Sequence, residues 1–425
     1  MSETHVQALE PAPGSDTPTI SLEQDLLAID LDAEGLVHCM KTAPLSTLRA
    51  VLFGRGDWRE YVRQNHSPDP SALPYVENVI ADVRGKAERG QMTALSTSGH
   101  PQAASSISMH LGIFNKVIHA QAPARQTPRL KATLPRFHWS LFLRVLRAHQ
   151  WAKNLLLFVP ALTAHRFDIA TIGLILLALV AFSLCASSVY IINDLIDLES
   201  DRRHPTKKAR PFASGECGVL TGAVLAPVLL IMSLGLALLV SANFGLALLG
   251  YFALTTAYTF YLKSKLVIDV IVLAMLYTGR ILAGGLASGI VVSHWLLAFS
   301  MFIFTSLALM KRYVELSTLV ANNLPDPQNR NYRATDLPIV AAVAAATSMN
   351  AVTIFALYIF AGTDVAYSRP WALWLICPLL LYWLARALVM AHRLEMNEDP
   401  VLFALKDRTS RMVLACTIIL VLFAI

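Results

Sequence analysis

The sequence predicts a bundle of about nine transmembrane helices preceded by a small α/β domain. Composition is the first reason, because the 425 residues are 55% hydrophobic and only 15% charged, with a mean hydropathy of +0.52. Patterning is the second, since the apolar residues form long uncharged blocks instead of the alternation typical of a soluble enzyme. These blocks begin near residue 141, so the earlier part of the chain is expected to fold outside the membrane.

Four segments follow from the composition along the chain. We expect a disordered lead at residues 1–22, an α/β domain at 23–120, a basic linker at 121–140 and the transmembrane domain at 141–425. The lead holds Ser, Thr, Glu, Pro and Gly without an apolar block, which predicts disorder and no signal peptide. The linker is rich in Arg, Lys and Pro and is expected to lie along the membrane surface.

The α/β domain alternates apolar runs with helical patterns. Short apolar runs at 26–29 and 92–95 predict strands, and the patterns at 43–53 and 75–89 predict helices. A further helix-like stretch ends in Val117-Ile118. Strand, helix, strand and helix in that order predict a small parallel sheet.

The long apolar blocks place the membrane spans. They are predicted at residues 141–164, 169–192, twice within 219–262, twice within 266–310, and at 337–362, 371–389 and 412–425, the last being short. Turns near residues 242–244 and 288–294 divide the double blocks. Lys and Arg concentrate in the loops 193–216, 263–265, 311–335 and 391–411. These loops, the N-terminus and the active site are therefore expected on the cytoplasmic side of a multi-pass inner-membrane protein.

An acidic cluster follows the second predicted span. Asn193, Asp194, Asp197 and Asp201 stand directly after a run of uncharged residues that begins at Ile169. If the helix continues, Asn193, Asp197 and Asp201 repeat every four residues and share one face with Asp194. Carboxylate and amide oxygens that do not enclose an ion favour Mg²⁺, which keeps water and accepts phosphate oxygens. These four residues are the predicted metal ligands, with Asp194 and Asp197 also predicted as catalytic.

The residues behind the acidic cluster carry the positive charge that a phosphorylated ligand needs. They are Arg202, Lys207, Lys208 and Arg210. The alternative is a loop that merely obeys the positive-inside rule, although such loops need no Asn and Asp at helical spacing. The net charge of +6 does not predict nucleic-acid binding, since Lys and Arg cluster beside the membrane spans.

Polar residues beside other spans are further candidates for the site. Lys153 is predicted to contact phosphate as a catalytic residue, with a snorkelling membrane anchor as the alternative. Asp269 and Arg280 lie on one helix face and are predicted to line the cavity, unless they form ion pairs with another helix. The remaining predicted substrate contacts are Arg147, Asn154, Lys263, Lys265, Lys311 and Arg312.

Nucleophilic catalysis has no support in the sequence. The five cysteines are scattered without metal-ligand spacing, so reduced structural thiols are expected. The transmembrane part offers no Ser-His-Asp or Cys-His pattern. This composition fits chemistry that depends on a metal ion and on positioning.

Two stretches of the α/β domain resemble the haloacid-dehalogenase-like phosphatases. Asp30-Leu31-Asp32 after a predicted strand and Ser96-Thr97 after a later one match the first two motifs, and residues 103–114 resemble the following helix. That family uses the first Asp as nucleophile, the second as acid/base, and a Lys with a further acidic pair. Here Ala33-Glu34 replaces the small residue and Thr expected next, and the Lys and acidic pair are missing. We interpret the domain as a degenerate remnant, with an active phosphatase as the alternative, and expect transfer activity without it.

The acidic cluster and the spans together resemble the UbiA superfamily of intramembrane prenyltransferases. The pattern Asn193-Asp194-x-x-Asp197-x-x-x-Asp201 matches its first aspartate motif, whereas the second is reduced to Asp269. Within the superfamily the chain is similar to the decaprenyl-phosphate phosphoribosyltransferases at residues 150–154, 204–211, 311–316 and 405–408. The resemblance covers residues 141–425 and implies a UbiA-like bundle around a cavity that opens toward the cytoplasm.

The resemblance implies a Mg²⁺-dependent membrane transferase whose donor loses diphosphate. Its expected partners are a soluble phosphorylated donor and a lipid substrate within the bilayer, polyprenyl phosphate or diphosphate, and no nucleic acid. The branch implies transfer of 5-phosphoribosyl from phosphoribosyl diphosphate to a polyprenyl phosphate, with inversion. One alternative is a prenyltransferase that uses a polyprenyl diphosphate and an aromatic acceptor. The other is a non-enzymatic lipid carrier or transporter.

Overall fold

The computed structural model describes residues 18–53, 58–119, 139–204, 206–326, 330–361, 367–396, 403–404 and 406–425. The chain divides into two compact units. The first comprises Met1–Leu146 and Tyr190–Ala226, and the second comprises Arg147–Val189 and Pro227–Ile425. Most of the predicted lead and almost all of the predicted linker lie outside the described residues.

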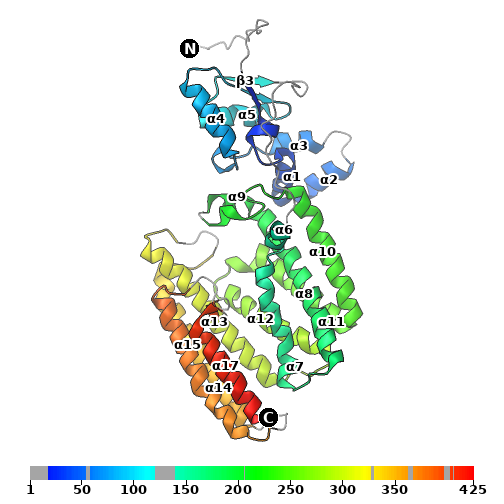
Figure 1. Ribbon diagram of the computed structural model, residues 1–425, viewed down its shortest axis with the longest axis vertical. Helices are drawn as coiled ribbons and strands as arrows, with labels where there is room; N and C mark the ends of the chain where they lie inside the picture. Colours follow the sequence, from blue (N-terminus) through cyan, green and yellow to red (C-terminus); the bar gives the residue numbers. More distant parts are fainter. Residues whose placement is uncertain are drawn as a thin grey trace. The chain divides into compact units, whose positions relative to one another are not determined.

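A three-stranded parallel sheet forms the centre of the N-terminal part (Figure 1). Its order is β1 (Thr19–Ser21), β2 (Ala94–Thr97) and β3 (Lys116–His119). Ile20 lies opposite Leu95, and Leu95 lies opposite Val117. The accompanying helices are η1 (Leu22–Leu26), α1 (Leu31–Thr42), α2 (Pro44–Phe53), α3 (Trp58–Asn65), η2 (Pro70–Ala72), α4 (Glu77–Glu88) and α5 (Pro101–Leu111).

The structure corrects two elements that the sequence predicted here. The predicted strand at 26–29 is wrong, because Leu26 ends the π-helical turn η1 and Leu27 makes only an isolated bridge with Tyr75. Both leucines are buried in the domain core, so their apolar character reflects burial and not strand pairing. Val117-Ile118 lies in strand β3 instead of ending a helix. The helices predicted at 43–53 and 75–89 are confirmed as α2 and α4.

The remaining chain is helical (Figure 1). Its elements are α6 (Trp139–Val145), η3 (Ala148–Phe158), α7 (Val159–Thr163), α8 (Ile169–Ile196), α9 (Leu198–Arg203), η4 (Lys207–Ala209), α10 (Val219–Val240), α11 (Ala242–Phe260), η5 (Leu262–Ser264), α12 (Ile268–Ser288), α13 (His294–Ala321), η6 (Ala334–Asp336), α14 (Leu337–Phe360), η7 (Pro370–Leu375), α15 (Ile376–His392) and α17 (Arg408–Ala424). Among the described residues, six helices are long and apolar enough to cross a membrane. They begin at Ile169, Val219, Ile268, His294, Ala334 and Pro370.

The first predicted span is not one continuous helix. Arg147 adopts a left-handed backbone with φ of 50°, and the chain then follows the 3₁₀ helix η3 and the short α7. Pro160 stands at the start of α7, where its missing N–H is tolerated. Helix α12 approaches η3 closely, because a Cβ on Gly284 would lie 2.2 Å from Leu157 O. A broken helix in contact with a glycine therefore replaces the predicted span 141–164.

The other predicted breaks agree with the structure more closely. The pair at 266–310 divides between Ser288 and His294, and the pair at 219–262 divides at Ser241. The predicted ninth span is α17, with 17 residues. Neither α11 nor α17 is among the six candidate spans in the described part of the chain, so the predicted number of nine stays a prediction.

Candidate active site

The acidic cluster lies where helix α8 ends. Asp197 interrupts the regular helix for one residue, and α9 continues it from Leu198. Helical hydrogen bonds cross the interruption, because Asp197 N donates to Asn193 O at 2.9 Å and Asp201 N donates to Asp197 O at 2.8 Å. The predicted helical register of Asn193, Asp197 and Asp201 is confirmed.

Two carboxylates of this cluster meet on one cation. Asp194 and Asp201 are 3% and 2% exposed. Arg210 Nη1 lies 3.3 Å from Asp194 Oδ1 and also makes an ion pair with Asp201 Oδ2. Buried carboxylates are stable only with such partners. The loop after α9 therefore folds back and supplies the positive charge.

The oxygen atoms of this cluster suit a divalent cation. Asn193 Oδ1 is buried and has no hydrogen-bond partner among the described residues. With the position shared by Asp194 and Asp201, it offers the hard oxygen ligands that Mg²⁺ takes, leaving sites for water and phosphate. No group of three His, Cys, Asp or Glu side chains suited to a metal occurs in the described part of the chain. The four predicted metal ligands therefore stay predictions, and their oxygen atoms are of the kind that Mg²⁺ takes.

The cations predicted behind the cluster differ in their contacts. Arg202 Nη1 donates to Glu34 Oε2 at 2.9 Å, and its Nε donates to Ala213 O at 3.1 Å. The 3₁₀ helix η4 begins at Lys207, which is half-buried, and Lys208 after it is exposed. Arg202 is thus held by a carboxylate of helix α1. The two lysines stay predictions for donor binding.

A second ion-pair cluster, in the other unit, joins α12, α13 and the loop before α14. Asp269 Oδ2 lies 2.9 Å from Arg312 Nε, and Tyr332 donates its hydroxyl to Asp269 Oδ1 at 2.9 Å. Glu315 pairs with both Arg312 and Arg330. The side chains of Asp269 and Arg312 are 0% and 2% exposed. Asp269 therefore forms an ion pair with another helix. Such a pair was the alternative, from the sequence, to Asp269 lining the cavity.

Arg312 keeps an unused hydrogen-bond donor in this second cluster. Its Nη2 is buried and has no partner among the described residues. Its Nε, although 2.9 Å from Asp269 Oδ2, is not aligned for a hydrogen bond. Buried guanidinium N–H groups are normally satisfied, and a phosphate oxygen is the acceptor that suits them. The geometry is compatible with the predicted phosphate contact of Arg312, and Lys311 beside it stays a prediction.

Arg280 has a hydrogen bond from each of its nitrogen positions to the protein. Nε donates to Asn154 Oδ1 at 3.1 Å, Nη1 to Leu276 O at 2.6 Å and Nη2 to Tyr251 OH at 2.7 Å. Asn154 Nδ2 in turn donates to Ser183 Oγ at 3.0 Å. Arg280 and Asn154, both predicted to bind substrate, therefore join η3, α8, α11 and α12. Tyr251 and Ser183 were missed, because nothing in the sequence distinguishes them from other helix residues.

The remaining predicted substrate contacts lie near element ends. Lys153 Nζ lies 5.8 Å from the ring centroid of Tyr277, within reach of a cation–π contact. Lys265 Nζ lies 4.5 Å from the ring centroid of Tyr261, and Lys263 belongs to η5. Arg147 precedes η3 in the left-handed conformation. Their contact with substrate stays a prediction.

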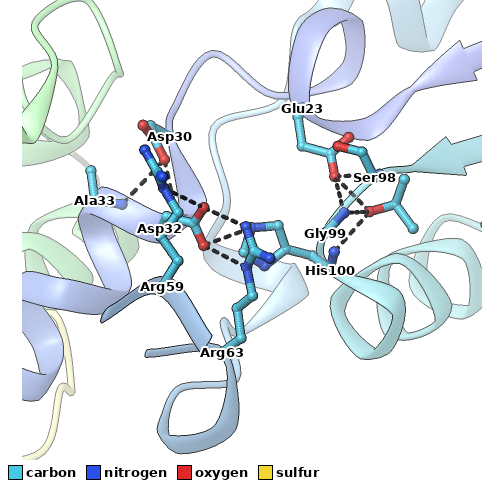
Figure 2. Close-up of polar contacts among 10 residues, drawn as sticks. Glu23, Asp30, Asp32, Ala33, Arg59, Arg63, Ser98, Gly99 and His100 are labelled. Atoms are coloured by element: carbon cyan, nitrogen blue, oxygen red, sulfur yellow. Dashed lines mark hydrogen bonds and ion pairs between the residues drawn. The ribbon is translucent and has the colours of Figure 1, made fainter. Parts of the chain in front are cut away.

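The carboxyl edge of the small sheet is where the phosphatases that the domain resembles would carry their site. Strand β1 ends at Ser21, so Asp30-Leu31-Asp32 does not follow a strand of this sheet. Glu23 instead lies beside the end of β2, where it accepts from Thr97 Oγ1 at 2.6 Å and from Ser98 N at 3.0 Å (Figure 2). A carboxylate of the chain thus occupies the donors that a phosphate would need.

The two Asp residues that resemble the first phosphatase motif have structural contacts. Asp30 caps α1, with its side chain accepting from Asp32 N at 3.0 Å and from Ala33 N at 3.1 Å. Asp32 accepts from Arg63 Nε at 2.8 Å and lies 3.2 Å from His100 Nε2 (Figure 2). Asp30 and Asp32 therefore do not follow a strand of this sheet as the first phosphatase motif would, and the resemblance itself stays a prediction.

Known proteins resemble this chain over most of its length. The family model described as the UbiA prenyltransferase family matches residues 155–414. The uncharacterized protein y4nM of Sinorhizobium fredii is 31% identical over 92% of this chain and 87% of its own length. The nodulation protein NoeC of Azorhizobium caulinodans is 36% identical, over 63% of this chain and 88% of that protein.

Phosphoribosyltransferases match a shorter part of the chain. The decaprenyl-phosphate phosphoribosyltransferase of Mycobacterium tuberculosis is 37% identical over 41% of this chain and 59% of its own length. Among solved structures, a UbiA homolog from Archaeoglobus fulgidus bound to GPP and Mg²⁺ has a TM-score of 0.51 and 18% identity. That alignment covers 66% of this chain and 99% of the homolog, and at this identity it establishes the fold.

Proposed function

The chain belongs to the UbiA prenyltransferase family and is an integral membrane transferase, and from this premise we propose its reaction. It moves 5-phosphoribosyl from phosphoribosyl diphosphate to a polyprenyl phosphate. The observation that carries the choice of donor is the 37% identity to proteins named decaprenyl-phosphate phosphoribosyltransferase. Because this chain spans 59% of that relative, the donor and acceptor are proposals to be tested on the whole protein.

The acidic cluster is proposed to bind the donor diphosphate. Asn193, Asp194, Asp197 and Asp201 would hold Mg²⁺, which offsets the charge that develops on a leaving diphosphate. Arg210, already between two of the carboxylates, is placed to pair with diphosphate oxygens once a metal ion takes its position. An oxygen of the lipid phosphate forms the new bond to the ribose C1, and the bond from C1 to diphosphate breaks.

The lipid phosphate needs a separate group of cations. Arg312 has a buried Nη2 without a partner among the described residues, and Lys311 precedes it. We assign the acceptor phosphate to these two residues and a phosphate contact to Lys153. A phosphate acceptor is already an anion, so no strong general base is required in this reaction.

A competition between donors tests the proposed reaction. Membranes that contain the protein are offered one of two donor–acceptor pairs, with the label on the donor. The first pair is phosphoribosyl diphosphate with polyprenyl phosphate, and the second is polyprenyl diphosphate with hydroxybenzoate. We expect lipid-linked label from the first pair only, and none in the Asp197→Asn variant. Label on hydroxybenzoate from the second pair would instead establish the aromatic prenyltransferase.

The active site is proposed to open on the cytoplasmic side. The acidic cluster and the basic loops share one side of the predicted topology. Single cysteines at Ser200 and Ser368, both exposed, can be labelled with an impermeant maleimide in cells after the native cysteines are replaced. Ser368→Cys should label in intact cells and Ser200→Cys only in inverted vesicles. The opposite pattern would place the donor site on the outer side.

A further inference from the structure

A buried ion pair connects the α/β domain to the helix that carries the acidic cluster. Glu34 lies in α1 and Arg202 in α9, and Arg202 Nη1 donates to Glu34 Oε2 at 2.9 Å. Their side chains are 8% and 7% exposed. Burial raises the pKa of Glu34 against the opposing effect of Arg202. A pair buried to this degree depends on both partners, because either charge left alone is strongly unfavourable.

Further contacts surround this pair and join α1 to α9 and to the end of α8. His38 Nδ1 lies 3.1 Å from Glu199 Oε1, and Lys41 Nζ donates to Ile196 O at 2.9 Å. The Lys41 contact involves the last residue of α8, immediately before Asp197. Helix α1 therefore contacts the chain on both sides of the position where the regular helix is interrupted.

The loop that follows α9 contacts the same domain. Gly215 has a φ of 79°, and a Cβ added there would lie 3.1 Å from Ala28 Cβ and Ile29 Cγ2. Arg202 Nε donates to Ala213 O at 3.1 Å. Arg202 thus connects Glu34 to the loop in which Arg210 stands.

Helix α9 is a short continuation of α8. It has six residues beyond the interruption at Asp197, and a segment of that length depends on tertiary contacts for most of its stability. Asp201 and Arg202 are neighbours on this short helix, so holding the Arg202 side chain fixes the rotation of the helix and the direction of Asp201. Without Glu34, the Arg210–Asp201 ion pair, the buried Leu198 and the backbone hydrogen bonds to α8 would remain, but the buried partner of Arg202 would be lost.

We propose that Glu34 is a positioning residue for the acidic cluster. Through Arg202 it fixes α9 and the following loop, so that Asp201 and Arg210 face Asp194. The α/β domain is then a structural part of the donor site and not a dispensable remnant, which replaces our expectation that transfer proceeds without it. The proposal rests on the proposed function insofar as the positioned carboxylates bind a divalent ion.

The test measures Mn²⁺ binding, by electron paramagnetic resonance, and hydrogen exchange in the full-length protein in detergent. Glu34→Ala should weaken Mn²⁺ binding by about tenfold, the effect typical of removing a residue that orients a metal ligand. It should also speed amide exchange at residues 197–203. Glu34→Gln keeps a hydrogen-bond acceptor and should give a smaller effect, which guards against a variant that merely misfolds.

A matched control and a double variant make the test specific. Asp69→Asn removes the exposed partner of Arg203, 2.7 Å away, and should leave both measurements unchanged. If Glu34 acts through Arg202, Glu34→Ala should have no further effect in an Arg202→Ala background. Unchanged Mn²⁺ binding and exchange in folded Glu34→Ala, or an equal loss in both backgrounds, would overturn the proposal.

Failure of the proposed function would give a different result. Asp197→Asn with the Mn²⁺ affinity of the unmodified chain would contradict the metal site. The exchange rates at residues 197–203 would still decide whether Glu34 orients α9.

Discussion

The two ion-pair clusters of this protein use similar side chains but differ in which buried atoms lack a hydrogen-bond partner among the described residues. In the acidic cluster, Asp194 and Asp201 share Arg210, and the buried atom without a partner is an acceptor, Asn193 Oδ1. In the second cluster, Asp269 Oδ2 and Arg312 Nε face each other at 2.9 Å without forming a hydrogen bond, and the donor Arg312 Nη2 remains without a partner. An unsatisfied acceptor among carboxylates favours a cation, whereas an unsatisfied guanidinium donor favours an anion.

The clusters also differ in access to solvent. The Arg210 side chain is 28% exposed, so it can move into solvent when another cation takes its place between the carboxylates. The side chain of Arg312 is 2% exposed and is held between two acidic residues. Exchange of partners is therefore expected at the acidic cluster, while the second cluster acts as a fixed element to which an anion adds.

The largest expected effect is at the acidic cluster. Asp197→Asn should lower transfer by at least about a hundredfold, since a ligand matters more than the residues that orient it. Asp168→Asn, which changes an exposed capping carboxylate before α8, is the matched control and should retain activity. Activity is measured by initial rates at saturating Mg²⁺, with folding checked by size-exclusion chromatography. Near-normal rates for Asp197→Asn would contradict the assignment of this cluster.

Substitutions in the second cluster should act mainly on the stability of the protein. Arg312→Leu leaves Asp269 and Glu315 without their shared cation, so the free energy of unfolding should fall by about 3 to 5 kcal/mol. The midpoint of thermal unfolding in detergent measures this loss.

Arg312→Lys separates stability from anion binding. It keeps the charge but loses the unused Nη2, so KM for the lipid phosphate should rise more than KM for the donor. The control is Arg386→Lys, which alters an ion pair with Asp407 at 2.7 Å. An equal rise in both KM values would show that Arg312 supports the fold and contacts no acceptor.

Arg280 provides a contrast with Arg312, because each of its three side-chain nitrogen atoms already donates a hydrogen bond within the protein. Tyr251→Phe removes the acceptor of Nη2 and should lower the free energy of unfolding by about 1 to 2 kcal/mol. Neither KM should change if Arg280 acts only through its hydrogen bonds to Asn154, Leu276 and Tyr251. Thermal unfolding and steady-state kinetics measure the two effects, and a selective rise in one KM would support the predicted contact of Arg280 with substrate.

The smallest effect concerns pH and the α/β domain. Burial, with a contribution from nearby His38, lowers the pKa of His66 from 6.5 to about 4. The folded state binds a proton at His66 less readily than the unfolded state does. The contribution of neutral His66 to the free energy of unfolding is therefore fully present above the unfolded pKa of 6.5 and is lost as pH falls toward about 4.

Amide hydrogen exchange of residues 31–65 should therefore accelerate as pH falls from 6.5 to about 4, after correction for the intrinsic exchange rates of an unfolded chain. His66→Gln should flatten this dependence, while exchange at the second cluster should be insensitive to the substitution. An unchanged slope in His66→Gln would assign the acid sensitivity to another group.

The sequence predicted helices well and tertiary contacts poorly, for physical reasons. Uncharged blocks such as 169–192 locate membrane helices, because hydrocarbon excludes charge. The run at Leu26-Leu27 misled the strand assignment, because burial alone makes a segment apolar whatever its backbone does. The true strand has three residues, which is too short for a pattern to form.

The sequence predicted the candidate site only where its residues are close together in the chain. The register of Asn193, Asp197 and Asp201 follows from helix geometry, and the structure agrees. The pairing of Arg202 with Glu34 joins residues 168 positions apart and depends on how the domain folds. Spacing also could not show that Arg280 would contact Asn154, 126 positions away.

The most direct test of the central claim is to locate Mn²⁺ by anomalous scattering in crystals of the protein grown with phosphoribosyl diphosphate. The account predicts one anomalous peak between the carboxylates of Asp194 and Asp201, within ligand distance of Asp197 and the Asn193 amide oxygen. Arg210 should then lie on the diphosphate instead of between the carboxylates. A peak at Asp269, or a loaded and active protein without a peak at the acidic cluster, would contradict it.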